Sequence, residues 1–207
     1  YSATPNPTDL MFQIASSTGV ALKIQANGAV YSDMAYSSTG ADYAEYFYSQ
    51  YTDLMPGETV CLDPTEPNAV KRCYRGHDNN VMGIVSSNPS IIGNAQDKAY
   101  NAKNGGYVIV GMLGQVDALV SAENGAINIG DSLTSASSTP GYAMRADGGD
   151  STVGVALEPL ASGMGKIKVL ISRRNKSMAV EEVEALVVER IANMKIEDQV
   201  QTMIKQA

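Results

Sequence analysis

The stretch YVIVGMLGQVDALVS, from Tyr107 to Ser121, is mostly apolar and contains four valines and one isoleucine. Residues of this kind favour β-strands. We expect two short strands here, Tyr107–Val116 and Ala118–Ser121. Apolar runs in this chain stay well below the roughly 20 residues that a membrane-spanning helix requires, so no membrane insertion is expected.

Short strand patterns separated by turn residues continue on both sides of this stretch, from about Gly57 to Ser172. The turns include Pro56-Gly57, Asn124-Gly125 and Pro140-Gly141. This close spacing predicts a compact all-β barrel or sandwich with few helices. The other expected strands are Val60–Leu62, Val70–Tyr74, Val81–Val85, Ser132–Thr134, Tyr142–Arg145, Val153–Leu157 and Lys166–Ile171.

The first 40 residues show alternation of apolar and polar side chains around a strong hairpin turn, Asn27-Gly28. They predict a β-hairpin arm of the kind that forms a fibre stem. An isolated hairpin is only marginally stable in water. The arm must therefore pack either on the domain that follows or on identical arms of other chains.

The apolar period changes in residues 174–207, where Ser177 can cap a helix with one apolar stripe. The stripe contains Val180, Val183, Val187, Ile191 and Met194, and Leu186 and Val188 widen it. It would pack on its own domain or, as we favour, on the same helix of sister chains. The predicted fold class is mainly β, with an N-terminal β-hairpin arm (1–40), a compact β-barrel or sandwich-like domain (41–173) and a C-terminal α-helical tail (174–207).

Charge and composition exclude several classes of function. Lys and Arg total 15 against 22 Asp and Glu, for a net charge of −7, so neither nucleic acid nor an anionic membrane surface is an expected partner. The one histidine, His77, is expected to be a solvated turn residue. With a single histidine, no closely spaced cysteine pair and no glycine-rich phosphate loop, we expect no metal site, no cofactor and no ordinary metabolic enzyme.

The two cysteines, Cys61 and Cys73, lie in two strand patterns joined by a turn. If Asp63 pairs with Lys71, then Cys61 faces Cys73 directly. Direct neighbours in an antiparallel pair have Cβ atoms about 4.5 to 5.5 Å apart, which is near enough for a disulfide. Two reduced, half-buried thiols remain the alternative.

The sequence DYAE places Asp42 and Glu45 three residues apart, shortly after Ser38, Thr39 and Gly40. A turn or helix would bring the two carboxyl groups together, whereas an extended strand would direct them to opposite faces. If they meet, one protonated carboxyl can donate to the Ser38 carbonyl while the other activates water or the Thr39 hydroxyl. The alternative is an ordinary solvated turn.

Several segments together resemble the self-cleaving C-terminal domain of phage pre-neck appendage (tail-spike) proteins, a family of glutamic-type peptidases also found at the ends of bacterial surface proteins. They are GADYAEYF, PGETVCLD, VMGIVSSNPSIIGN, VGMLGQVDALVSAENGAINIGDSLTSASSTPGYAMRA and VGVALEPL. The resemblance covers roughly Gly28 to Ile171. It implies an extracellular, trimeric fibre whose terminal domain assists assembly and is then released by intramolecular cleavage.

Carried onto this chain, the resemblance assigns the acidic pair to Asp42 and Glu45 and the cleaved bond to Ser38-Thr39. The family pattern has an acidic residue before that bond, where this chain has Ser38, so cleavage is expected to be slow or absent. The competing interpretation is a non-catalytic cap or adhesion module of an extracellular fibre. Tyrosines such as those near the acids more often pack in a core or an interface, but exposed ones would suggest binding to a host-surface protein or carbohydrate.

Overall fold

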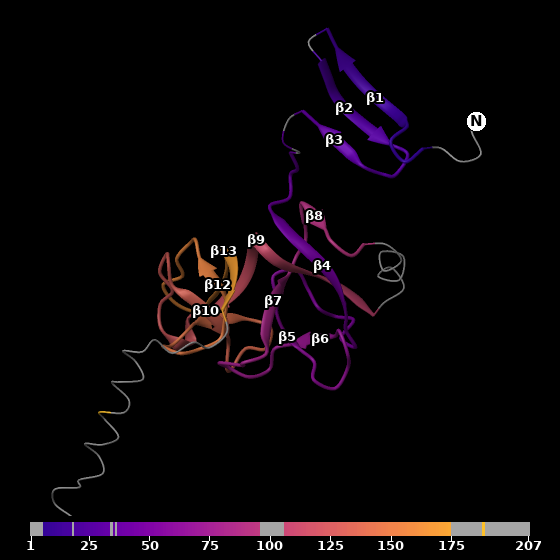
Figure 1. Cartoon of the computed structure of the whole chain (residues 1–207). Coiled ribbons are helices and arrows are strands. Elements are labelled where there is room, and N and C mark those ends of the chain that lie inside the picture. Colours follow the sequence, from indigo (N-terminus) through magenta and orange to yellow (C-terminus); the bar gives the residue numbers. More distant parts are fainter. Residues whose placement is uncertain are drawn as a thin grey trace, which may run out of the picture. The chain divides into compact units, whose positions relative to one another are not determined.

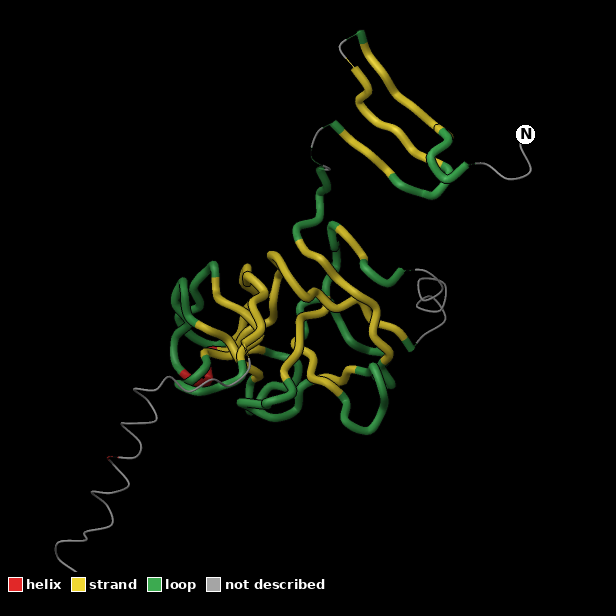
Figure 2. The backbone as a smooth tube through the Cα atoms, in the orientation of Figure 1, coloured by secondary structure: helices red, strands yellow, loops and turns green. Residues whose placement is uncertain are grey.

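The computed structural model describes residues 6–17, 19–33, 35, 37–95, 106–174 and 188. The chain divides into two compact units, Tyr1–Thr39 and Gly40–Ala207. Both units are built of strands (Figures 1 and 2). Within the described residues no helix is long and apolar enough to cross a membrane.

The N-terminal unit is a three-stranded antiparallel meander of β1 (Leu10–Ser16), β2 (Gly19–Gln25) and β3 (Val30–Ser32). The predicted turn at Asn27-Gly28 is confirmed between β2 and β3. Gly28 has a positive φ of 83°, and the Asn27 side chain accepts a hydrogen bond from the Ala29 amide at 3.0 Å. These are the properties that make Asn-Gly a good hairpin turn.

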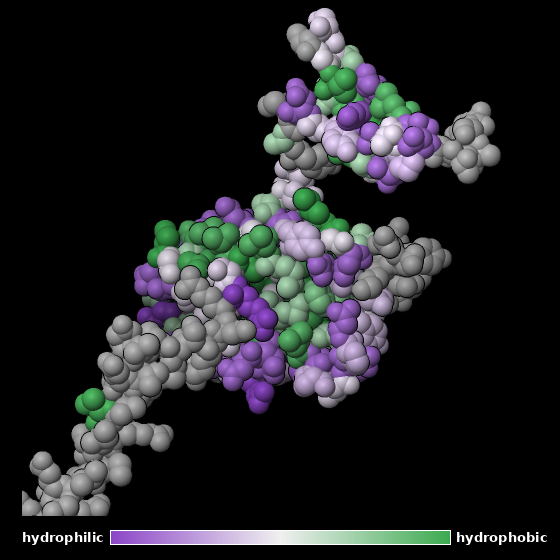
Figure 3. Space-filling model, in the orientation of Figure 1, coloured by the Kyte–Doolittle hydropathy of each residue, from purple (hydrophilic) through white to green (hydrophobic). Residues whose placement is uncertain are grey.

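The strands of this unit expose their apolar side chains (Figure 3). Every residue of β1 and β3 is exposed, and β2 is at most half-buried. A sheet gains stability by burying one face against another layer, and the described residues of this unit contain no such layer. The exposed large apolar residues are Leu10, Met11, Phe12, Ile14, Val20, Val30 and Tyr31.

The second unit contains a closed five-stranded barrel. Its strands are β9 (Tyr107–Ser121), β10 (Ser132–Ser135), β11 (Ala143–Arg145), β12 (Thr152–Ala156) and β13 (Met164–Arg174). They pair in the order β9-β13-β12-β10-β11, and β11 returns to β9 through Ala143 opposite Val120. Closure removes the free sheet edges that would otherwise pair with other chains.

The remaining strands surround the first half of β9. They are β4 (Asp42–Tyr48), β5 (Thr59–Leu62), β6 (Val70–Arg72), β7 (Val81–Val85) and β8 (Ile91–Ile92). Both β4 and β7 pair with β9, and β8 and β5 extend the sheet beyond them. The sequence predicted two strands in Tyr107–Ser121, but the structure has one of 15 residues, because the second half of the strand pairs without interruption with β13.

Two clusters of buried side chains form the core. One fills the barrel, where buried residues of β9 and β13 alternate with outward-facing ones such as Asp117 and Lys168. The other lies between β4, β5, β7 and the first half of β9. Fully buried members from both clusters include Val60, Ile84, Val110, Val120, Leu133, Val153 and Val169.

The structure corrects the predicted fold class. The fold is mainly β, and the only helical element with defined bounds in the described residues is the 3-10 turn Ala122–Asn124. The predicted C-terminal α-helical tail is not shown. It falls outside the described residues, apart from Arg174, which ends β13, and Val188. Val188 belongs to the predicted apolar stripe; its backbone is helical and its side chain is 65% exposed.

Cys61 and Cys73 form a disulfide, with their Cα atoms 5.1 Å apart. The strand register differs from the predicted one by two residues. Cys61 lies opposite Lys71, and Cys73 donates its amide to the Thr59 carbonyl. The cysteines are therefore diagonal rather than direct neighbours. Both are almost fully buried in the core cluster that fills the barrel.

Replacing both cysteines by alanine is expected to lower the free energy of unfolding by about 3 kcal/mol. The bond closes a short loop, with 12 residues of separation, and so restricts the unfolded chain. Urea unfolding of the oxidised wild type and of the double variant measures the difference. Equal midpoints in the two proteins would contradict the expectation.

Candidate functional site

The two acids of the DYAE motif lie at the start and middle of β4, an extended strand. Antiparallel pairing holds it against β9 from Asp42 opposite Gly114 to Tyr48 opposite Tyr107. On its other edge, β4 pairs in parallel with β8, where Tyr43 lies opposite Ile91. The β4–β9 pairing is interrupted by a bulge between Tyr43 and Ala44. The extra residue of this bulge belongs to β9, so β4 itself stays regular.

Two glycines let neighbouring backbone approach the start of β4 closely. A Cβ on Gly114, which has a φ of 107°, would lie 2.4 Å from the Ala41 carbonyl oxygen. A Cβ on Gly40 would lie 2.4 Å from the Pro89 carbonyl carbon. Both distances are too short for any side chain. Gly40 therefore serves close packing against the segment after β7, rather than a backbone bend with positive φ.

Because side chains of a strand alternate, Asp42 and Glu45 point to opposite faces of β4. Asp42 shares the inner face with Ala44 and Tyr46, which are buried. Glu45 shares the outer face with Tyr43, whose hydroxyl donates to Glu45 Oε1 at 2.6 Å. Within one chain the structure thus does not bring the two carboxyl groups together.

Asp42 is 4% exposed, and its two oxygens differ in their partners. Oδ1 accepts a hydrogen bond from the Ser86 hydroxyl at 3.1 Å, whereas Oδ2 has no hydrogen-bond partner. Oδ2 faces Gly111, where a Cβ would lie 2.9 Å from this oxygen and 2.8 Å from Ile171 Cδ1. A buried carboxyl with one unsatisfied oxygen is costly, and functional sites are where such groups are retained.

Burial raises the pKa of the Asp42 carboxyl above its ordinary value of 3.8, and the hydrogen bond from Ser86 opposes this rise. Asp42 thus keeps its proton to a higher pH than an exposed aspartate. In the protonated state Oδ2 can donate a hydrogen bond or a proton, and Ser86 keeps Oδ1 in place. This is the chemistry of a general acid.

The outer-face acid has a different environment. Glu45 is half-buried, and its bond from Tyr43 raises the pKa of the Tyr43 hydroxyl above its ordinary value of 10.0. The other two predicted site residues, Ser38 and Thr39, are exposed and belong to the N-terminal unit, which ends at Thr39. The acids belong to the second unit.

Sequence reasoning missed the roles of Ser86 and Tyr43. Ser86 lies in the GIVSSNP segment, directly after β7 ends at Val85, and it contacts Asp42 across a sequence distance of 44 residues. No local pattern gives that pairing. The Tyr43-Glu45 hydrogen bond could have been predicted from a strand assignment alone, because residues i and i+2 of a strand share a face.

The comparisons with known proteins concern the fold. No family model matches the chain, and no curated protein matches it. Among solved structures, that of the pre-mature bacteriophage phi29 gene product 12 is similar, with a TM-score of 0.50 and 16% sequence identity over 74% of this chain. The C-terminal fragment of the same phage protein aligns with a TM-score of 0.43 and 17% identity over 63% of this chain.

The match to the pre-mature protein covers 24% of that protein, so this chain spans about a quarter of its length. At this identity the likeness concerns the fold alone. The fold is thus that of a region of a phage protein, and it places no catalytic residue in this chain.

Asp42 is expected to lower the stability of the protein as pH rises. Since its native pKa is raised, the native state binds the proton more tightly than the unfolded state, and stability is lost as pH rises from 3.8 through the native pKa. The unfolding free energy of wild type minus that of Asp42→Asn should therefore fall as the pH rises from 3.8 through the native pKa. Urea unfolding across this range measures it.

Ser86→Ala provides the matched comparison. Removing the bond that lowers the pKa of Asp42 should raise that pKa further, so this variant should lose more stability with rising pH than the wild type does. Parallel curves for wild type and Asp42→Asn would show that the Asp42 pKa is not raised.

Proposed function

We propose that this chain is an assembly domain of a homotrimeric fibre related to phage appendages, located on a virion or on a cell surface. The observation that carries the proposal is the N-terminal unit, whose strands leave their apolar side chains exposed. Such a sheet cannot bury a core from its own described residues. Identical sheets of sister chains provide the missing layer, as in a fibre stem.

The second unit also exposes an apolar row, on the outer face of β4. Tyr43 lies opposite Ile91 of β8 on one side and opposite Leu113 of β9 on the other. Residues directly opposite in a sheet point to the same face, and these three are 37%, 56% and 64% exposed. A contiguous apolar row on a sheet face is typical of a protein interface. Glu45 lies beside it.

Two further arguments support this function. The fold is similar to a region of a phage protein in its pre-mature form. The sequence segments that contain Asp42, Ser86 and β9 resemble the C-terminal domain of trimeric pre-neck appendage proteins. The net charge of −7 also makes nucleic acid an unsuitable partner.

A second function, self-cleavage at the Ser38-Thr39 bond, is favoured by one specific observation. Asp42 is a buried carboxyl with a raised pKa and an unpartnered oxygen, and it follows that bond by three residues. In this proposal Asp42 is the proton donor and Glu45 the base. Because the acids face opposite sides of β4, Glu45 can take part only if β4 rearranges or if sister chains supply the two acids. Without cleavage the domain is a structural cap or an adhesion module for a host-surface protein or carbohydrate.

Light scattering on the purified chain should give about three times the 21.9 kDa chain mass. Replacing Leu113 by lysine should weaken the trimer at least about tenfold, because a charge on the apolar row must be buried in the interface. Ile129→Lys is the matched control, since Ile129 is equally apolar, is 68% exposed and lies outside the row. A monomeric wild type would remove the assembly proposal.

Self-cleavage is tested by incubating the purified protein at several pH values and recording its intact mass. The wild type should yield fragments 1–38 and 39–207, and Asp42→Asn and Glu45→Gln should form them at least about 100-fold more slowly, because each removes an acid-base group. If all three proteins stay intact for days, the chain is not a self-cleaving peptidase and the structural role alone stands.

A further inference from the structure

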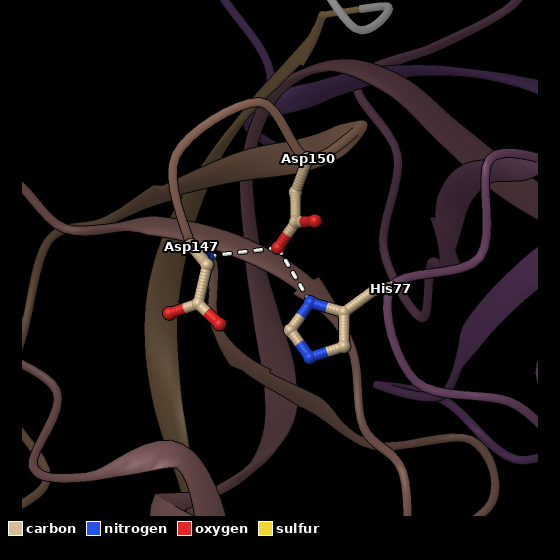
Figure 4. A group of neighbouring side chains, drawn as sticks. All are labelled: His77, Asp147 and Asp150. Carbon is tan, nitrogen blue, oxygen red and sulfur yellow. Dashed lines mark hydrogen bonds and ion pairs between the residues drawn. The ribbon is translucent and has the colours of Figure 1, made fainter. Parts of the chain in front are cut away.

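The single histidine of the chain lies beside two aspartates that come from a distant turn. His77 belongs to the loop between β6 and β7, and Asp147 and Asp150 belong to the turn between β11 and β12 (Figure 4). His77 Nδ1 lies 2.5 Å from Asp150 Oδ2, and the Asp147 amide donates to the same oxygen at 2.8 Å. The sequence predicted only a solvated turn residue at His77.

One potential ligand atom from each of the three residues lies within 4.8 Å of the other two. Figure 4 shows the three side chains around one shared space. Ligand nitrogen and oxygen atoms lie about 2.0 to 2.2 Å from a tetrahedral zinc ion, so two of its ligand atoms lie about 3.4 Å apart. Asp147 is exposed, so its side chain can turn toward the ion, while His77 and Asp150 must move apart by about 1 Å.

The surroundings orient this cluster and leave room beside it. Asn124 Nδ2 donates to Asp147 Oδ1 at 3.1 Å and so orients that carboxylate from outside the group. An open cavity of about 270 Å³ adjoins the cluster on the side of His77 and Asn124. It gives a hydrated ion access and leaves space for water in the coordination positions that the protein does not fill. The cavity is lined by His77, Glu123, Asn124, Ser137, Ser138 and Met144.

We propose that His77, Asp147 and Asp150 form a binding site for a divalent transition-metal ion of the zinc or manganese class. The imidazole nitrogen makes the site unsuited to calcium or magnesium, which prefer all-oxygen ligands. The two negative charges of the carboxylates balance the two positive charges of the ion, and the imidazole binds the ion as a neutral ligand. On binding, the ion breaks the hydrogen bond between His77 and Asp150 and takes a ligand atom from each residue. It thereby fastens the β6–β7 loop to the β11–β12 turn.

A second turn of the same kind gives a matched control. Asp131 accepts the Asn128 amide at 2.7 Å, as Asp150 accepts the Asp147 amide, again three residues apart. Among the described residues, the grouping of three metal-ligand side chains contains His77, Asp147 and Asp150 but not Asp131. Asp131→Asn therefore changes a comparable turn without touching the proposed ligands.

The test uses the metal-stripped full chain without a histidine tag. Because the sequence contains one histidine and the two cysteines are joined, His77 gives the only imidazole signals in a proton NMR spectrum and no free thiol competes for zinc. We expect zinc chloride to shift these signals with one ion per chain and half-saturation below about 100 µM, and to raise the unfolding temperature by mass action. Calcium chloride should leave the signals unchanged.

His77→Gln and Asp147→Asn should each weaken zinc binding at least about tenfold in calorimetric titration, whereas Asp131→Asn should bind like the wild type. Asp147 is exposed, so its variant is expected to fold. The proposal is overturned if the His77 signals do not respond to about 1 mM zinc, or if His77→Gln retains wild-type affinity.

Discussion

The antiparallel pairing of β4 with β9 is the constraint on which the rest of the structure depends. It keeps Asp42–Tyr48 extended, and an extended strand alternates its side chains between two faces. Asp42 therefore enters the core, next to Gly111, and Glu45 lies on the outer face beside Tyr43. The same β9 continues into the barrel through β13, so the position of the acids is fixed to the rigid part of the molecule.

This alternation gives the two acids of the motif different environments. The inner face holds the buried Asp42 carboxyl, whose pKa is raised by burial and whose Oδ1 is held by Ser86. The outer face presents an apolar row across three strands, with Glu45 at its side. A substitution on the outer face therefore does not touch the contacts of the Asp42 carboxyl on the inner face.

Local sequence patterns predicted much of the β structure and little of the site. The Asn27-Gly28 turn and the strand positions follow from turn chemistry and apolar alternation. The length of β9 and the register of β5 and β6 depend on pairing between strands, which local patterns do not give. The continuous β13 partner merges two predicted strands into β9, and the β5–β6 register places Cys61 opposite Lys71 instead of Cys73.

The C-terminal α-helical tail was wrong as part of the predicted fold class, since the described residues contain no α-helix with defined bounds. Contacts across long sequence distances could not be predicted at all. Ser86 reaches Asp42 over 44 residues, and Asp150 reaches His77 over 73. Each of these contacts depends on strands that meet only in the folded chain.

A carbon-13 NMR titration of the Asp42 carboxyl, assigned by its loss in Asp42→Asn, tests the central claim most directly. The arrangement predicts a midpoint above 3.8 that does not change in Glu45→Gln, since the two acids lie on opposite faces of β4. A midpoint at or below 3.8, or one that moves when Glu45 is replaced, would contradict it.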